Sequence, residues 1–337
     1  MTKQQNGKTE VYLPESNVPM YDLGDVDAAL QGILTVGYDE EELRAYMTDY
    51  YLSEAAVDGQ SYDLVDMYKA VFSQALTQVR STNFVTSLEL GAGFGSGTYA
   101  MASLYPELKI ITSELSAQML VRHKKEGEKH PECSDRIIRC QINADRPTFK
   151  DSCFDLVFGT AILHHVFDPL SVISDVGRML KPNGVAIFTE PFEPGYGLLR
   201  IVYEMLLWQH KRGELELTDQ QYNYLANTVR YWSMINTDNV RSIEELSNID
   251  DKWIFPYEYF DKTARQVGFD IVNKLPIGIH LDEKRHIENL YVTHTVGNNV
   301  ELPTIGLELV RLVDNCFSRQ QLACMPHDGV LVLQKKA

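Results

Sequence analysis

Apolar and polar positions along the chain form blocks that predict an α/β protein. Short apolar runs that end in glycines or acidic residues are typical of buried parallel strands, and segments with apolar residues at helical spacing lie between them. Seven strands are predicted by this pattern. They begin at Thr86, Lys109, Ile137, Phe154, Val185, Asp270 and Gly329. The alternation of strands and helices predicts a Rossmann-like, mostly parallel sheet.

Three stretches lie outside this alternation. Apolar residues recur at helical spacing over Asp39–Tyr51 and Tyr62–Val79, which predicts N-terminal helices. The links that follow the fifth and sixth strands are far longer than the roughly 2 to 6 residues usual for such units. The first link is rich in aromatic residues and holds two amphipathic segments, which begin at Leu198 and Asp219.

We divide the chain accordingly into four parts. They are an N-terminal helical lid (1–80), a core (81–193), an aromatic-rich helical cap (194–258) and a completion of the core (259–337) with a helical insertion at about 281–327. Links that leave the carboxyl ends of strands emerge on the ligand side of a doubly wound sheet. We therefore expect the lid and both insertions to meet above a bound ligand. The alternative is that these helices only extend the hydrophobic core.

A glycine-rich turn follows the first predicted strand and opens a helix. Glycine adopts positive φ freely and lets a ligand approach the backbone, so Gly91, Gly93 and Gly95 predict a binding turn. A dinucleotide-binding turn needs Gly-x-Gly-x-x-Gly at the strand end, but the sixth position counted from Gly91 is Ser96. A simple tight turn has the same composition, so the choice of ligand depends on the residues that follow.

The register Glu89-x-Gly91-x-Gly93-x-Gly95 resembles the first motif of class I S-adenosylmethionine (SAM) methyltransferases. In that family the acidic residue orients the loop and lies near the methionine ammonium of SAM. Glu114 ends the next strand about twenty positions later, where a carboxylate can accept both ribose hydroxyls. The resemblance therefore implies that this chain binds SAM and releases S-adenosyl-L-homocysteine.

Two later segments extend the resemblance and also depart from it. The family usually has Asp-Ala after the third strand, whereas this chain has Asn143-Ala144, so the adenine acceptor is either Asn143 or Asp145. The run Leu163-His164-His165, followed by Asp168-Pro169, resembles the post-strand segment of small-molecule methyltransferases related to the quinone-biosynthesis C-methyltransferases.

The resemblance implies a fold and a set of cofactor-binding residues. The fold is a seven-stranded, mostly parallel sheet whose last strand is antiparallel, with N-terminal helices and a helical cap inserted after strand 5 and between strands 6 and 7. The implied cofactor residues are Glu89, Gly91, Ala92, Gly93, Gly95, Glu114, Leu115, Met119, Asn143, Ala144, Thr160 and Ala161.

Methyl transfer is a displacement at a sulfonium, so the protein must align the acceptor and, where the acceptor carries a proton, supply a base. His164 and His165 lie just beyond the fourth strand, and Glu190 ends the fifth, so these three are the candidate catalytic residues. In the resembled family one such histidine is commonly structural. Glu193 is a rival of the same kind as Glu190, and weaker rivals are His210, Tyr222 and Tyr224.

Composition narrows the class of partner. The chain has 47 acidic and 31 basic residues in 337, a net charge of −16, which disfavours a nucleic-acid substrate. No apolar run approaches the roughly 18 residues of a membrane span and the first residues lack a signal-peptide core, so we expect a cytoplasmic protein. The five cysteines show no zinc-ligand spacing, and no catechol-type metal-binding set of acidic residues is recognisable, so we predict no metal. A homodimer is compatible with the sequence.

Three functions remain open at this point. The first is a small-molecule methyltransferase of a biosynthetic pathway, with oxygen acceptors favoured over carbon or nitrogen. The second is a protein or peptide methyltransferase with an open groove, and the third is a non-catalytic SAM-binding partner subunit. An enclosed cavity of roughly a few hundred Å3 would favour the first function.

Overall fold

The computed structural model describes residues 2–5, 8–47, 49–53, 64–277 and 286–337, and it contains one sheet of eleven strands in the order β1-β2-β3-β4-β7-β6-β5-β8-β9-β11-β10. The predicted class is confirmed, because β4 to β9 pair in parallel and β11 runs antiparallel to β9 and β10. The strands predicted from the sequence are β5 (Thr86–Leu90), β6 (Lys109–Glu114), β7 (Ile137–Gln141), β8 (Phe154–Thr160), β9 (Leu180–Pro191), β10 (Phe269–Ile277) and β11 (Asp328–Lys335).

The sheet exceeds the predicted seven strands because the N-terminal segment adds four short ones. These are β1 (Thr2–Gln5), β2 (Lys8–Val11), β3 (Met20–Asp22) and β4 (Ile33–Thr35). The last of them joins the sheet in parallel with β7, with Leu34 opposite Cys140. Strands of three or four residues are too short for their alternation to be visible in the sequence. Tertiary pairing and the complete burial of Met20 and Ile33 stabilise them instead.

Helices follow the N-terminal strands, and within the described residues they cover part of the two stretches whose apolar pattern predicted helix; positions 48, 62 and 63 of those stretches lie outside the described residues. They are α1 (Glu40–Arg44), α2 (Asp49–Leu52) and α4 (Val65–Ala75). In α1 the start is set by a capping box, in which Asp39 accepts from the Glu42 amide and the Glu42 side chain accepts from the Asp39 amide. Along α4, Phe72 and Ala75 are buried and pack toward the sheet.

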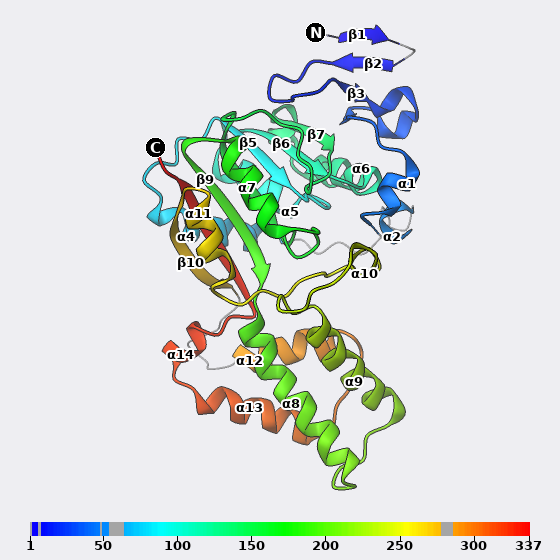
Figure 1. Ribbon diagram of the computed structural model, residues 1–337, viewed down its shortest axis with the longest axis vertical. Coiled ribbons are helices and arrows are strands. Elements are labelled where there is room, and N and C mark those ends of the chain that lie inside the picture. Colours follow the sequence, from blue (N-terminus) through cyan, green and yellow to red (C-terminus); the bar gives the residue numbers. More distant parts are fainter. Residues whose placement is uncertain (1, 6–7, 48, 54–63, 278–285) are drawn as a thin grey trace.

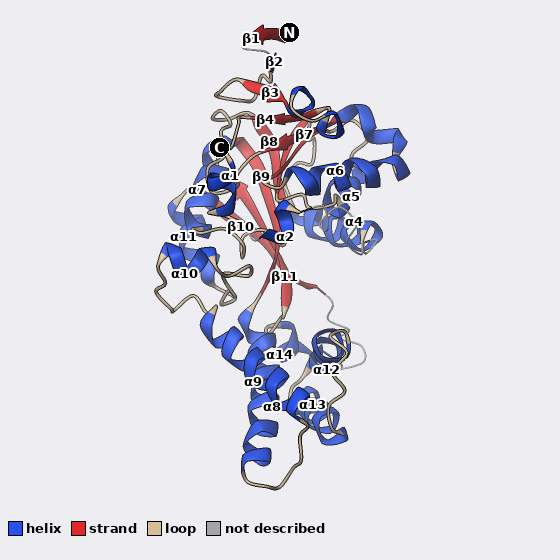
Figure 2. Ribbon diagram, turned by 90° about the vertical axis from the view of Figure 1, so that its right-hand side faces the viewer, coloured by secondary structure: helices blue, strands red, loops and turns tan. Residues whose placement is uncertain are grey.

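Two layers of helix cover the sheet (Figure 2). On one face lie α4, α5 (Ser96–Leu104) and α6 (Ala117–Glu126), and on the other lie α7 (Pro169–Met179) and α11 (Tyr259–Gln266). The first layer buries Ala100 and Met101, and the second buries Ile173 and Phe260. Burial on both faces explains why β5 and β8 are apolar along almost their whole length.

The two insertions form a helical lobe with its own core. The lobe contains α8 (Glu193–Lys211), α9 (Asp219–Met234), α12 (His286–Tyr291), α13 (Thr304–Cys316) and α14 (Arg319–Ala323). Tyr203 and Trp232 stack at its centre with ring centroids 5.7 Å apart. Helix α8 starts two residues after β9 and α14 ends shortly before β11, so the lobe lies beyond that end of the sheet (Figure 1). Among the helices of the described residues, none is both long and apolar enough to cross a membrane.

Candidate functional site

The glycine turn after β5 has the left-handed backbone that its sequence predicted. Gly91 and Gly93 have φ values of +65° and +53°, in the region that favours glycine. A Cβ atom at Gly91 would lie 2.4 Å from Cδ1 of Ile162, which belongs to the loop after β8. At Gly93 the nearest atom to an added Cβ would be Cε of Met119 at 3.8 Å, so this glycine keeps space open for a ligand.

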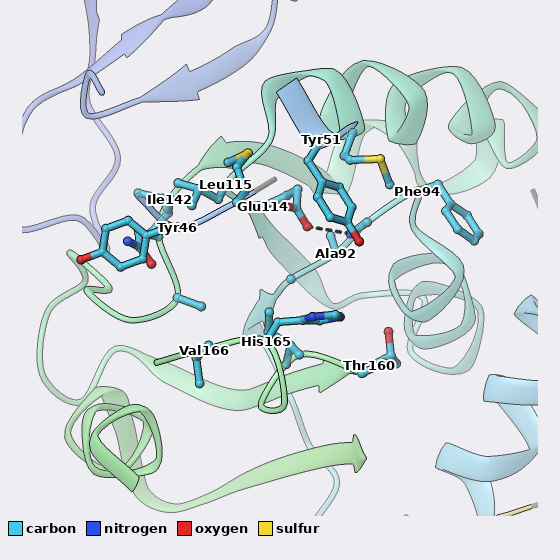
Figure 3. A pocket seen from close by; sticks show the side chains of 18 of the residues that line it. Tyr46, Tyr51, Ala92, Phe94, Glu114, Leu115, Ile142, Thr160, His165 and Val166 are labelled. Carbon is cyan, nitrogen blue, oxygen red and sulfur yellow. Dashed lines mark hydrogen bonds between the residues drawn. The ribbon is translucent and has the colours of Figure 1, made fainter. Parts of the chain in front are cut away.

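That space is a cavity of about 300 Å3 at the carboxyl ends of the parallel strands. Except for Glu89, every cofactor residue predicted from the sequence lines it. Figure 3 shows Glu114, Leu115 and Ala92 on one wall and Thr160 and His165 on another. The walls therefore come from the ends of β5, β6 and β8 and from the loop after β7, as the topology of a doubly wound sheet requires.

Glu89 lies behind the glycine turn instead of lining the cavity. Its carboxylate is fully buried and accepts hydrogen bonds from the hydroxyls of Thr98 and Thr112. Burial raises the pKa of Glu89 to about 8, although both hydrogen bonds act in the opposite direction. Its side chain ties the strand to the start of α5, and a Cβ at Gly97 would come within 2.8 Å of it.

Glu114 is positioned by two backbone amides at the end of β6. Its Oε2 accepts from the Gly93 amide at 3.1 Å and its Oε1 accepts from the Ser116 amide at 3.1 Å. Ser116 in turn caps α6 by accepting from the amide of Met119. Burial raises the pKa of Glu114, and the amide hydrogen bonds oppose that rise. The carboxylate is thus held rigidly, with remaining lone pairs for the two hydroxyls of a ribose.

Asn143 and Asp145 both line the cavity beyond Glu114, and both already accept backbone hydrogen bonds. The amide oxygen of Asn143 accepts from the Asp145 amide at 2.9 Å. One carboxylate oxygen of Asp145 accepts from the amides of Phe167 and Asp168 at 2.8 and 3.3 Å. Asp145 therefore connects the loop after β7 to the loop after β8, while Ile142 and Met119 supply apolar surface for a base between them.

The two adjacent histidines after β8 have different environments. His164 is buried, and its Nδ1 donates to Glu190 Oε2 at 2.7 Å. Glu190 also accepts from the amides of Ile162, Leu163 and His164, so it organises the loop and does not face the cavity. His165 lines the cavity, and its Nδ1 lies 3.0 Å from the backbone carbonyl of Asp250.

These contacts set the charges of the histidines. Burial alone would lower the pKa of His164, but the hydrogen bond and charge of Glu190, with Asp251 3.6 Å from Nε2, raise it. Burial and the neighbouring His164 lower the pKa of His165. At neutral pH His165 is therefore the uncharged member of the pair. Its Nδ1–H donates to the Asp250 carbonyl, and no hydrogen bond of its Nε2 is found among the described residues.

Comparisons with known proteins agree with this geometry. The family described as "Methyltransferase domain" matches residues 88–188. The demethylmenaquinone methyltransferase of Lactiplantibacillus plantarum is 27% identical over 167 residues, which cover 48% of this chain and 69% of that protein. The ubiquinone/menaquinone biosynthesis C-methyltransferase of a Shewanella species is 28% identical over 148 residues, which cover 42% of this chain and 58% of that protein.

This chain carries a SAM-dependent methyltransferase domain at residues 88–188. The matched regions place it among the relatives of the quinone C-methyltransferases, although it spans only about three fifths of the length of most of those relatives. A solved structure of phosphoethanolamine N-methyltransferase 2 from Haemonchus contortus has a TM-score of 0.50 at 14% identity, covering all of this chain and 71% of that one, which shows a shared fold.

Three observations indicate that SAM fits the cavity of the methyltransferase. Gly93 leaves open space at the turn, Glu114 presents a fixed carboxylate at the end of β6, and apolar side chains line the slot beyond it. The glycine turn could hold the methionine part of SAM, Glu114 its ribose, and the region of Met119 and Asn143 its adenine. SAM supplies the activated methyl group, and the protein's residues orient it.

The structure adds cavity residues that the sequence did not single out. They come from the N-terminal segment and from the link after the lobe, and they are Tyr46, Met47, Tyr51, Leu64, Tyr68, Asp250 and Lys252. The first five lie within the two stretches, 39–51 and 62–79, whose apolar spacing predicted N-terminal helices. Nothing in the sequence pointed to Asp250, because its position depends on how the link returns from the lobe to the core.

The helices of the lobe do not roof the cavity, so the expectation that both insertions meet above the methyl group is met, among the described residues, only by Asp250 and Lys252 from the end of the first insertion. No described residue of α8, α9, α12 or α13 lines the cavity. The rival base candidates His210, Tyr222 and Tyr224 lie in that lobe, and Glu193 at its start accepts from Asn236. Tyr203, Trp232 and Tyr291 pack in the core of the lobe, and Trp208 and Tyr222 are exposed on its surface, so none of them covers the ligand.

His164, His165 and Asp251 also form a group with ligand atoms within 4.8 Å of one another, a spacing that could hold a metal ion. The hydrogen bonds of His164 with Glu190 and of His165 with the Asp250 carbonyl already occupy one nitrogen of each ring. The sequence predicted no metal, and chelation tests that prediction directly.

Proposed function

We propose that this methyltransferase transfers the methyl group of SAM to a small-molecule nucleophile bound beside His165, and that His165 accepts the proton of the acceptor. The observation that carries the proposal is the tautomer of His165. Because Nδ1–H donates to the Asp250 carbonyl, the lone pair of neutral His165 is on Nε2, on a residue that lines the cavity.

The neighbouring charges support this role. His164 lies between Glu190 and Asp251, which raise its pKa against the effect of burial, while burial and the neighbouring His164 lower the pKa of His165. Once His165 has taken a proton, Asp250 and Asp251 lie 3.8 and 3.7 Å from its Nδ1 and stabilise the imidazolium. Glu190 acts by positioning the loop, and the remaining acceleration comes from alignment of acceptor and methyl group.

The residues that cover the cavity favour a small acceptor over a protein substrate. Tyr46, Met47 and Tyr51 from the N-terminal segment and Asp250 from the return link enclose it, and Tyr51 donates to Asp250 at 3.2 Å across the two. A protein substrate needs an open trough, and a non-catalytic subunit needs no free base. The biosynthetic names of the relatives support a biosynthetic acceptor, for which we keep oxygen, carbon and nitrogen as targets. Cytoplasmic location and a homodimer stay predictions.

The test is methyl transfer from labelled SAM to a metabolite extract of the source organism, with the labelled product identified by mass spectrometry. We expect His165→Asn to lower kcat by about 10²- to 10⁴-fold, the usual contribution of a general base. The affinity for S-adenosylhomocysteine should stay unchanged in this variant. Full activity of the variant would remove His165 as the base, and a protein without any transfer activity would refute the proposal.

A further inference from the structure

We infer that the acceptor is a small amine whose ammonium is received by the carboxylates of Asp250 and Asp251 beside His165. The inference rests on the proposed methyl transfer and names the substrate class of the same site. Three features of the cavity support it: the balance of charge in its wall, the contacts of these two carboxylates, and the position of a proton acceptor beside them.

Negative charge exceeds positive charge in the cavity wall. Among the described residues that line it, Glu114, Asp145 and Asp250 are acidic and Lys252 is basic. Lys252 interacts with the charges of Asp250, Asp145 and Asp251, lies over the ring of Phe167, and donates to the carbonyl of Ile249 at 2.9 Å. SAM itself neutralises only part of the excess, because its carboxylate offsets one of its two cationic groups.

The carboxylates of the wall have different contacts, and Asp250 accepts fewer hydrogen bonds than Glu114 or Asp145. Glu114 is fixed by the amides of Gly93 and Ser116 at the ribose position. Asp145 holds the amides of Phe167 and Asp168. Within the part of the chain that the structure describes, the Asp250 carboxylate accepts one hydrogen bond, from the Tyr51 hydroxyl at 3.2 Å, so its remaining lone pairs can receive a ligand.

Asp250 lines the cavity, and the neighbouring Asp251, which does not line it, lies 3.6 Å from His164 Nε2. Both side chains are about half exposed (48%), and their nearest oxygens lie 3.8 and 3.7 Å from His165 Nδ1. These separations exceed a direct hydrogen bond, so neither carboxylate is satisfied by the neutral imidazole. A phosphate or carboxylate acceptor would be repelled here and a neutral alcohol would gain little, whereas an ammonium would be attracted.

Aromatic rings line the same part of the cavity. Tyr51 and His165 project toward one another from opposite walls (Figure 3), and Tyr68 lies against Thr160, whose side chain also lines the cavity. Tyrosine faces attract organic cations, and the hydroxyl of Tyr51 already orients the carboxylate of Asp250. The combination of two carboxylates and two tyrosines therefore suits an amine better than a phenol or an enol.

The reaction balances with the residues present. The ammonium R–NH3⁺ gives one proton to Nε2 of neutral His165, and the free amine attacks the methyl carbon of SAM. The C–N bond forms as the C–S bond breaks, and the electron pair stays on sulfur in S-adenosylhomocysteine. The product is the methylated ammonium, and the proton on His165 leaves to solvent beside Asp250 and Asp251.

The test uses the full chain, methyl-labelled SAM and a metabolite extract separated at pH 7 into cationic, neutral and anionic fractions. We expect labelled product from the cationic fraction. With that fraction as acceptor, Asp250→Asn and Asp251→Asn should each raise KM about 10- to 100-fold, the range expected for a lost hydrogen bond to a charged group. The affinity for S-adenosylhomocysteine should change less than twofold. Glu216→Gln, an exposed acid between α8 and α9, is the control and should leave KM unchanged.

Each other outcome refutes the inference in a distinguishable way. Label in the neutral or anionic fraction alone overturns the amine class but leaves methyl transfer standing. Asparagine variants that bind SAM more weakly, yet retain both the affinity for neutral S-adenosylhomocysteine and the KM for the acceptor, would show that the carboxylates serve the sulfonium. A folded protein that binds SAM and labels nothing overturns the proposed function together with the inference.

Discussion

Replacing Glu114 by glutamine tests the cofactor site most directly. The substitution keeps the shape of the side chain but removes its charge and one of its two acceptor oxygens. In the structure these oxygens accept from the amides of Gly93 and Ser116, so the amide group of glutamine would face one of these donors with a donor of its own. The turn and the start of α6 are therefore affected along with the ribose contact.

The magnitude follows from the hydrogen bonds between this carboxylate and the ribose. A hydrogen bond to a charged group contributes about 1.5–3 kcal/mol, and the carboxylate is expected to make two of them to the ribose. Glutamine keeps one acceptor oxygen, so the loss of one of these hydrogen bonds would cost about 1.5–3 kcal/mol, which corresponds to roughly 10- to 10²-fold weaker binding. Since Glu114 carries a raised pKa through burial, neutralising it also removes a desolvation cost, so we expect the lower half of that range.

Isothermal titration with S-adenosylhomocysteine measures the effect, and the far-ultraviolet circular dichroism spectrum confirms the fold. Glu107→Gln is the matched control, because Glu107 is an exposed acid on the link before β6 and should bind the ligand like the wild type. A dissociation constant of Glu114→Gln within twofold of the wild type would remove Glu114 from the site. It would also refute the assignment of the ribose to the end of β6.

The remaining predictions concern the turn, the base and the metal. Gly91→Ala should lower the free energy of unfolding by about 1–3 kcal/mol and weaken SAM binding. The residue has φ +65°, and its added Cβ would clash with Ile162. Thermal melts with and without SAM measure both effects. Since the pKa of His165 is lowered and the base must be neutral, kcat/KM should be flat above about pH 6.5 and fall as the pH drops through that lowered pKa; a profile still rising above pH 8 would contradict this assignment. Dialysis against EDTA should leave activity unchanged, and a loss restored by zinc would instead place a metal on His164, His165 and Asp251.

The local sequence was sufficient to predict those parts of the site that are formed by residues close to one another in the chain. The strand, the glycine turn and the following helix are contiguous, so Gly91, Gly93 and the acid at the next strand end could be located by spacing alone. The same spacing could not separate the roles of His164 and His165. Their difference arises from Glu190, 26 residues from His164, and from the Asp250 carbonyl, 85 residues from His165.

The sequence by itself determined the class of fold, the cofactor and most of the cavity wall, because strand ends and turns are encoded by neighbouring residues. Only the tertiary structure decided that Glu89 lies behind the turn, that β1 to β4 extend the sheet and that the aromatic lobe stands apart from the cavity. Short strands are stabilised by pairing with strands that are distant in the sequence. The aromatic side chains of the lobe are stabilised more by packing against one another than they would be by covering a polar site.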